Sequence, residues 1–138
     1  MIQLIIGEKG KGKTKVLLDK ANKEVLTASG NVVYLDKSSK HMYELNNKVR
    51  LIDVSAFDIE NSAEFTGFLN GIISQDHDLE QMYFDNFLSI AKCEDTYEDV
   101  LTRIEQISKK SGVNFVIAMS KVESDLSDTW KDSIIAAL

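Results

Sequence analysis

A glycine- and lysine-rich segment near the N-terminus constrains the fold of this chain more than any other feature. It runs Gly7-Glu8-Lys9-Gly10-Lys11-Gly12-Lys13-Thr14 and matches the pattern G-x-x-x-x-G-K-[ST] at every fixed position. It follows the apolar run Ile2–Ile6, which is typical of a strand buried on both faces of a parallel sheet. From Lys13, apolar residues recur at helical spacing as far as Ala28, and Gly30 is the expected helix-ending residue. The order strand, glycine loop, helix predicts an α/β fold.

The residues of this segment are suited to holding a polyphosphate. Glycines permit backbone conformations that turn successive N–H groups toward one anion, and the N-terminus of the following helix adds partial positive charge. Lys13 is expected to reach the β- and γ-phosphates of a nucleotide, and the Thr14 hydroxyl to ligate Mg²⁺. We therefore predict that a nucleoside triphosphate binds along Gly7, Glu8, Lys9, Gly10, Lys11, Gly12, Lys13 and Thr14.

Strand-like and helix-like segments alternate along the rest of the chain. Apolar runs predict strands at 32–36, 49–54, 79–84 and 113–119, and amphipathic spacing predicts helices at about 62–74, 96–111 and 128–138. The polar stretch 37–48 is expected to be a loop with a helical turn. Because helices separate most strands, we expect a three-layer sandwich, with a mostly parallel five-stranded sheet and helices on both faces. No composition break divides residues 1–138, which predicts a single domain.

Polar residues follow two of these predicted strands, where a parallel sheet gathers its ligands. Asp85 ends the mostly apolar run that starts at Gln81, and its carboxylate is the expected partner of Thr14 in holding Mg²⁺. Ser120 directly follows the last predicted strand. With these motifs the chain resembles the P-loop nucleoside triphosphatases of the RecA-like type, in which Asp85 corresponds to the Walker B aspartate. The resemblance implies that Ser120 contacts the γ-phosphate and that the ligands are ATP and Mg²⁺.

The chain departs from this pattern at the residue that activates water. Many hydrolysing relatives place a glutamate directly after the Walker B aspartate, whereas this chain has Asn86, whose amide can orient water but cannot accept its proton. Asp36, at the end of the second predicted strand, is the expected catalytic base beside the catalytic Lys13, and Asp53 is the alternative. We therefore expect hydrolysis that is weak or dependent on a partner.

Three functions remain open from the sequence. The first is an ATP-binding protein with weak or partner-dependent ATPase activity, in which Arg50 or Arg103 serves a neighbouring subunit or makes only a surface ion pair. The second is a small-molecule kinase of nucleoside type, although the zinc-binding cysteines and substrate lasso of RecA-like thymidine kinases are missing. The third is a regulatory module that senses nucleotide through Ser120 and residues 37–48 without hydrolysing it. The segment 120–123 departs from the guanine-reading N-K-x-D pattern at two positions, so we expect ATP rather than GTP.

Charge and composition bear on partners and location. The formal charge of −6 argues against a general nucleic-acid-binding surface, which needs clustered cations. A homo-oligomer or a separate protein partner is the expected way to complete the site. Apolar runs are far shorter than the roughly 20 residues that span a bilayer. We expect no secretory signal, because Met1 is followed by an apolar run without a basic lead or a small-residue cleavage site. We therefore expect a cytoplasmic protein with no membrane segment.

Overall fold

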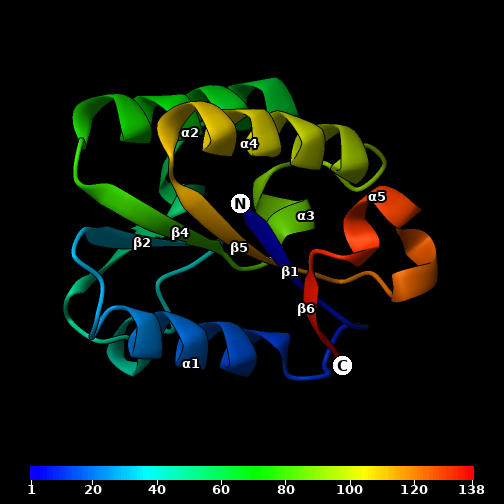
Figure 1. Cartoon of the computed structure of the whole chain (residues 1–138), viewed down its shortest axis with the longest axis horizontal. Coiled ribbons are helices and arrows are strands. Elements are labelled where there is room, and N and C mark those ends of the chain that lie inside the picture. The colour runs from blue at the N-terminus through cyan, green and yellow to red at the C-terminus, as the bar shows by residue number, and fades with distance from the viewer.

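The computed structural model describes all of residues 1–138 and shows an α/β fold around one sheet (Figure 1). Its six strands are all parallel and lie in the order β3-β2-β4-β5-β1-β6. The strands are β1 Ile2–Ile6, β2 Asn31–Asp36, β3 Val49–Asp53, β4 Leu79–Phe84, β5 Asn114–Met119 and β6 Ile134–Ala137. The helices are α1 Lys13–Glu24, α2 Ser62–Gln75, α3 Phe87–Ile90, α4 Tyr97–Ser111 and α5 Asp128–Lys131. None of these helices combines the length and the apolar character that crossing a bilayer would require.

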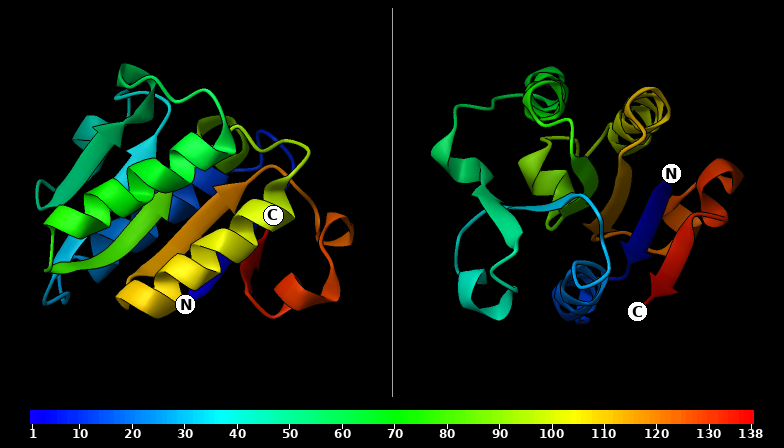
Figure 2. Two further views of the ribbon diagram at one scale, coloured as in Figure 1. Left: turned by 90° about the horizontal axis from the view of Figure 1, so that it is seen from above. Right: turned by 60° about the vertical axis from the view of Figure 1, so that its left-hand side comes forward.

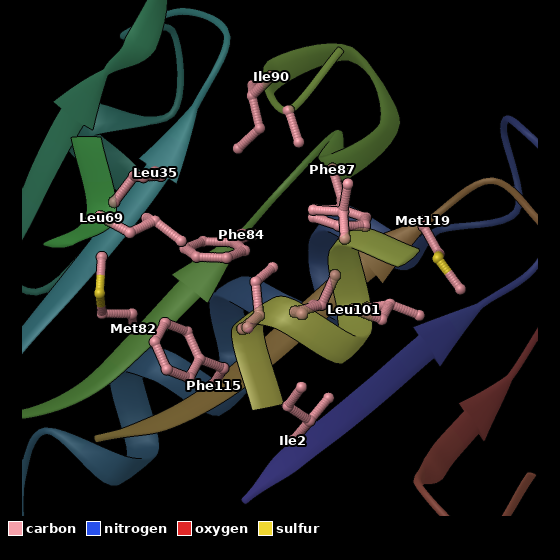
Figure 3. Close-up of a cluster of buried hydrophobic side chains, with 14 of the residues drawn as sticks. Ile2, Leu35, Leu69, Met82, Phe84, Phe87, Ile90, Leu101, Phe115 and Met119 are labelled. Atoms are coloured by element: carbon pink, nitrogen blue, oxygen red, sulfur yellow. The ribbon is translucent and has the colours of Figure 1, made fainter. Parts of the chain in front are cut away.

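Helices cover both faces of the sheet, as expected (Figure 1, Figure 2). On one face, α2 and α4 lie over the larger apolar cluster, in which the rings of Phe84 and Phe115 are 5.5 Å apart (Figure 3). On the other face, α1 packs Leu17 and Ala21 against Ile5 of β1 and its neighbours. Burying both faces explains why the central strands are almost continuously apolar in sequence.

The C-terminal segment departs from the expected five-stranded, mostly parallel sheet. The apolar spacing predicts one helix over 128–138, but α5 ends at Lys131 and the sixth strand β6 follows. β6 pairs in parallel with β1, and the N–H of Leu138 donates to the carbonyl of Ile6 at 2.9 Å. Along β6, half-buried and exposed residues alternate with the period of a strand. The helix prediction is wrong here because pairing with β1 satisfies the backbone of both segments.

The two glycines predicted to end helices differ in their roles. α1 ends at Glu24, well before Gly30. A Cβ on Gly30 would lie only 2.3 Å from the carbonyl oxygen of Asp78, so this glycine permits close backbone packing and does not end the helix. Gly112, in contrast, follows α4 with φ 80°, as expected for a helix-ending glycine. The short helix α3 directly after Asn86 has no counterpart among the predicted elements.

Candidate functional site

The carboxyl ends of neighbouring strands meet at one edge of the sheet. Because β2, β4, β5 and β1 are parallel and adjacent, Asp36, Asp85, Ser120 and Gly7 follow one another along this edge. Open parallel sheets bind ligands outside this edge. A cavity of about 310 Å³ opens there, lined by Lys9, Gly10, Gly12, Lys13, Thr14, Lys37, Lys40, His41, Asp85, Asn86, Ala118, Met119 and Ser120. We refer to it as the phosphate cavity, after the ligand that the sequence predicts for its loop.

Most of the predicted binding residues line the phosphate cavity. Those that do are Lys9, Gly10, Gly12, Lys13, Thr14, Asp85 and Ser120, whereas Gly7, Glu8, Lys11 and Asp36 do not. Gly7 is buried: its N–H donates to the carbonyl of Lys121 at 2.8 Å, and a Cβ on it would lie 2.8 Å from the carbonyl oxygen of Leu138. Gly7 therefore shapes the loop without facing the cavity.

The loop after β1 presents a row of unpaired backbone donors. Gly10 and Gly12 have φ of 84° and 94°, a region that glycine adopts far more readily than other residues. No N–H group from Glu8 to Lys15 donates to a backbone oxygen of the chain, and Gly12 caps α1 without a side-chain hydrogen bond. Helix N-termini normally satisfy such donors with a side chain, water or an anion. The loop therefore offers these donors to the oxygens of a phosphate group.

The side chain of Lys13 lies back across the same loop. Its Nζ donates to the carbonyl oxygen of Glu8 at 2.9 Å. Partial burial lowers the pKa of the Lys13 ammonium, and the carboxylate of Asp85 opposes this by favouring the charged form. Both residues line the phosphate cavity, so its wall contains a cation and an anion that attract each other without forming an ion pair.

Two buried carboxylates lie beside each other at this edge. Asp85 is 3 % exposed, and it accepts hydrogen bonds from the Asn86 N–H at 2.9 Å and from the Tyr34 hydroxyl at 3.1 Å. Asp36 is 1 % exposed, and its Oδ1 accepts from the Lys37 N–H at 2.7 Å and from Asn86 Nδ2 at 3.0 Å. The other oxygen, Asp36 Oδ2, has no hydrogen-bond partner. Burial, and then the charge of Asp85, raise the pKa of Asp36 above its ordinary value.

Asn86 connects the phosphate cavity to Asp36. It adopts the left-handed conformation with φ 52° and ψ 45°, which asparagine tolerates better than most residues. Its side chain lines the cavity and also donates to Asp36, which does not line the cavity itself. A water molecule in the cavity would thus meet Asn86 first. The raised pKa would make ionised Asp36 a stronger proton acceptor than an ordinary aspartate.

Two features of the site go beyond the sequence predictions. Lys37, Lys40 and His41, from the connection between β2 and β3, line the phosphate cavity together with the glycine loop. The sequence predicts contact of residues 37–48 with a nucleotide only for a regulatory module, and it names none of these three side chains as a binding residue. The second feature is the hydrogen bond from Tyr34 to Asp85, which depends on β2 lying beside β4.

Neither arginine lines the phosphate cavity. Arg50 lies on the edge strand β3 and forms an ion pair with Asp76 at 3.2 Å. Arg103 lies on the surface of α4. Asp53, the alternative base, accepts hydrogen bonds from the backbone and the hydroxyl of Ser55 and so caps the turn after β3. The arrangement within the chain therefore favours Asp36 over Asp53 as the acid closest to Asp85.

Thr14 and Asp85 supply the types of oxygen that Mg²⁺ prefers. No group of three or more His, Cys, Asp or Glu side chains is placed to hold a metal ion. Magnesium commonly keeps several waters and binds one or two carboxylates together with substrate phosphates. The two residues therefore fit a magnesium ion that arrives with a polyphosphate, and they do not form a complete metal cage by themselves.

Comparison with known proteins adds no family to this geometry. No protein-family model matches the chain, and no curated protein sequence matches it.

Proposed function

We propose that this chain binds ATP with Mg²⁺ in the phosphate cavity and is a P-loop NTPase of the RecA-like type. The observation that carries the proposal is the row of unpaired N–H groups from Glu8 to Lys15. Residues of this row, including Lys13, line the cavity. The strand order supports the RecA-like type, because β5 lies between β1 and β4 and so separates the loop from Asp85. In the kinase-GTPase layout those two strands are direct neighbours.

Each lining residue then has a separate task. The loop amides bind phosphate oxygens, and Lys13 neutralises charge on the β- and γ-phosphates. Thr14 and Asp85 hold the magnesium ion, which supplies further neutralisation of the phosphates. Ser120, which follows β5 between the loop and Asp85, lines the cavity, and in this proposal its hydroxyl contacts the γ-phosphate.

The proposed hydrolysis is slow or requires a partner. Asn86 donates through Nδ2 to Asp36, so its Oδ1 remains able to accept a hydrogen bond from an attacking water. Asp36, which lies behind Asn86 and does not line the cavity, would take the proton of that water through one intervening water molecule, as the base that Asn86 cannot be. The cations opposite the loop are Lys37 and Lys40, so an arginine finger would have to come from another molecule.

Calorimetric titration of the chain with ATP in the presence of Mg²⁺ tests the binding site. Lys13→Ala removes a charge-assisted hydrogen bond of about 2 kcal/mol, so affinity should fall about thirtyfold. Lys23→Ala is the matched control, because it removes the same charge from the exposed last turn of the same helix. Equal ATP affinity in Lys13→Ala and in Lys23→Ala would refute the site.

A phosphate-release assay tests the catalytic part separately. Asp36→Asn should lose most of the turnover and keep its ATP affinity, because Asp36 lies behind the cavity wall and contacts Asn86. Turnover equal to that of the wild type would remove Asp36 as the base and leave the binding site intact. Tight ATP binding with no phosphate release, even with candidate partners, would identify a nucleotide sensor in place of an ATPase.

A further inference from the structure

A second cavity lies at the same carboxyl edge of the sheet, beyond the phosphate cavity. Its volume is about 280 Å³, close to the lower end of small-molecule pockets. It lies where β2, β3 and α3 come together, and its lining residues are Lys37, Val54, Ser55, Phe57, Ile59, Ser89, Ile90 and Lys92. The carboxyl edge of a parallel sheet is where such folds place their ligands.

The charged lining of this second cavity is entirely basic. Lys37 and Lys92 are both exposed, and neither forms an ion pair within the chain. No acidic residue lines the cavity. The nearby Asp53 accepts hydrogen bonds from the backbone and the hydroxyl of Ser55, and Glu94 lines only the hollow between the two cavities. Two unpaired ammonium groups without an acid select for an anionic ligand.

The remaining lining is largely apolar and distinguishes this cavity from the phosphate cavity. Val54 and Ile90 are buried at its wall, and Ile59 is half-buried. Phe57 is 52 % exposed, with its ring centroid 5.3 Å from that of Phe68. A large exposed aromatic ring beside buried aliphatic side chains favours a ligand with an apolar group over a free inorganic anion.

The second cavity and the phosphate cavity are neighbours that share a lining residue. Lys37 lines both cavities. A third hollow between them shares Asn86 with the phosphate cavity and Ser89 with the second cavity. A ligand of the second cavity would therefore lie next to Asn86 and Lys37 in the wall of the phosphate cavity.

Lys92 is presented to the second cavity by an unusual backbone conformation. Its φ of 53° places it in the left-handed region, in the turn that follows α3 and Ala91. The turn is closed by hydrogen bonds from the N–H of Lys92 to Ser89 at 3.4 Å and from the N–H of Cys93 to Leu88 at 3.1 Å. Lys92 lines neither the phosphate cavity nor the connecting hollow. It is therefore the residue that separates the two sites experimentally.

We propose that the second cavity binds a small organic anion, whose carboxylate or phosphate pairs with Lys37 and Lys92 and whose apolar group contacts Phe57 and Ile59. The site is distinct from the proposed nucleotide site, although Lys37 belongs to both. It supplies the chain with a binding position for a second, non-nucleotide ligand next to the nucleotide.

An NMR titration of the full chain with phenyl phosphate, without nucleotide, tests this site. We expect the ring signals of Phe57 and the methyl signals of Ile59 and Ile90 to shift. Lys92→Ala should weaken binding by about fivefold, which is the upper range for one exposed ion pair. Lys23→Ala, which removes a lysine from α1 on the opposite face of the sheet, should leave these shifts unchanged.

Two further probes separate the contributions of charge and apolar contact. Benzyl alcohol, which keeps the ring and lacks the charge, should bind more weakly than phenyl phosphate, and so should inorganic phosphate, which lacks the ring. If either probe bound as tightly as phenyl phosphate, measured from the signals of Phe57, Ile59 and Ile90, the proposal would be overturned. Binding that is lost in Lys13→Ala and kept in Lys92→Ala would also overturn it, because the probe would then occupy the phosphate cavity.

The outcome for the second cavity can be distinguished from the outcome for the proposed ATP site. Phenyl phosphate binding that depends on Lys92, in a chain that does not bind ATP, would support the second site and refute the nucleotide site. ATP binding that depends on Lys13, together with no shift at Phe57, would refute the second site alone.

Discussion

Replacing Tyr34 with Phe removes one buried hydroxyl and keeps the shape of the side chain. The hydroxyl donates to Asp85 at 3.1 Å, and burial, followed by the charges of Asp85 and Asp36, raises the pKa of Tyr34, so that it remains the donor. A hydrogen bond to a charged group contributes about 1.5–3 kcal/mol, so we expect the free energy of unfolding to fall by about 2 kcal/mol. For 138 residues, with about 2.1 cal/mol/K of unfolding entropy per residue, Tm should fall by about 7 °C.

Tyr83→Phe is the matched control for this substitution. Tyr83 is also buried, and its ring stacks near that of Tyr34 with the centroids 6.4 Å apart. Its hydroxyl donates to the neutral side chain of Gln81 at 2.6 Å, so its loss should cost about 1 kcal/mol, or about 3 °C in Tm. Urea unfolding followed by circular dichroism, with unchanged m-values, measures both variants. If Tyr34→Phe is no more destabilised than Tyr83→Phe, the argument that Tyr34 holds a charged Asp85 is refuted.

Three other perturbations give separate tests. Because the pKa of Asp36 is raised in the folded chain, its ionised form lowers the free energy of unfolding at mildly alkaline pH, and Asp36→Asn should be more stable than wild type there. The difference in stability should close as the pH falls toward the unfolded-state pKa of about 3.9. A difference that does not change with pH would contradict this. Gly12→Ala should lower the free energy of unfolding in urea by about 1–2 kcal/mol, because Gly12 has a φ of 94°. Gly67→Ala, in the middle of α2 with open space around its Cβ, should raise it by about 0.5–1 kcal/mol. Equal effects would contradict the conformational reason. Burial raises the pKa of the Cys93 thiol to about 12, so iodoacetamide should modify it only in denaturant, and rapid labelling of the folded chain would contradict its burial.

Most strands were predictable because their burial leaves a local record in the sequence. Ile2–Ile6 and Leu79–Phe84 are strands with the predicted bounds, since both are runs of mostly apolar residues that end at a polar or glycine residue. β6 could not be predicted in the same way. Its four residues have little strand signal of their own, and they form a strand because β1, more than a hundred positions earlier, has a free edge beside them.

The site was predictable to the extent that it is local in sequence. The loop, Lys13 and Asp85 follow from one motif and one strand end, and the structure brings them to one cavity. The hydrogen bonds of Tyr34 and Asn86 to the two acids arise only when β2 lies beside β4. Strand order is set by long-range pairing, so a single sequence does not reveal these contacts.

The position of Gly7 has a consequence for how the glycine loop is attached to the sheet. Gly7 is fixed at the end of β1 by a hydrogen bond to Lys121 and by the backbone of Leu138 packed against it. The residues just after it have no such anchor, because their amides bond to no other backbone group. Gly7 therefore fixes the point at which the loop leaves the sheet, and the amides that follow it are left without a partner from the chain's own backbone.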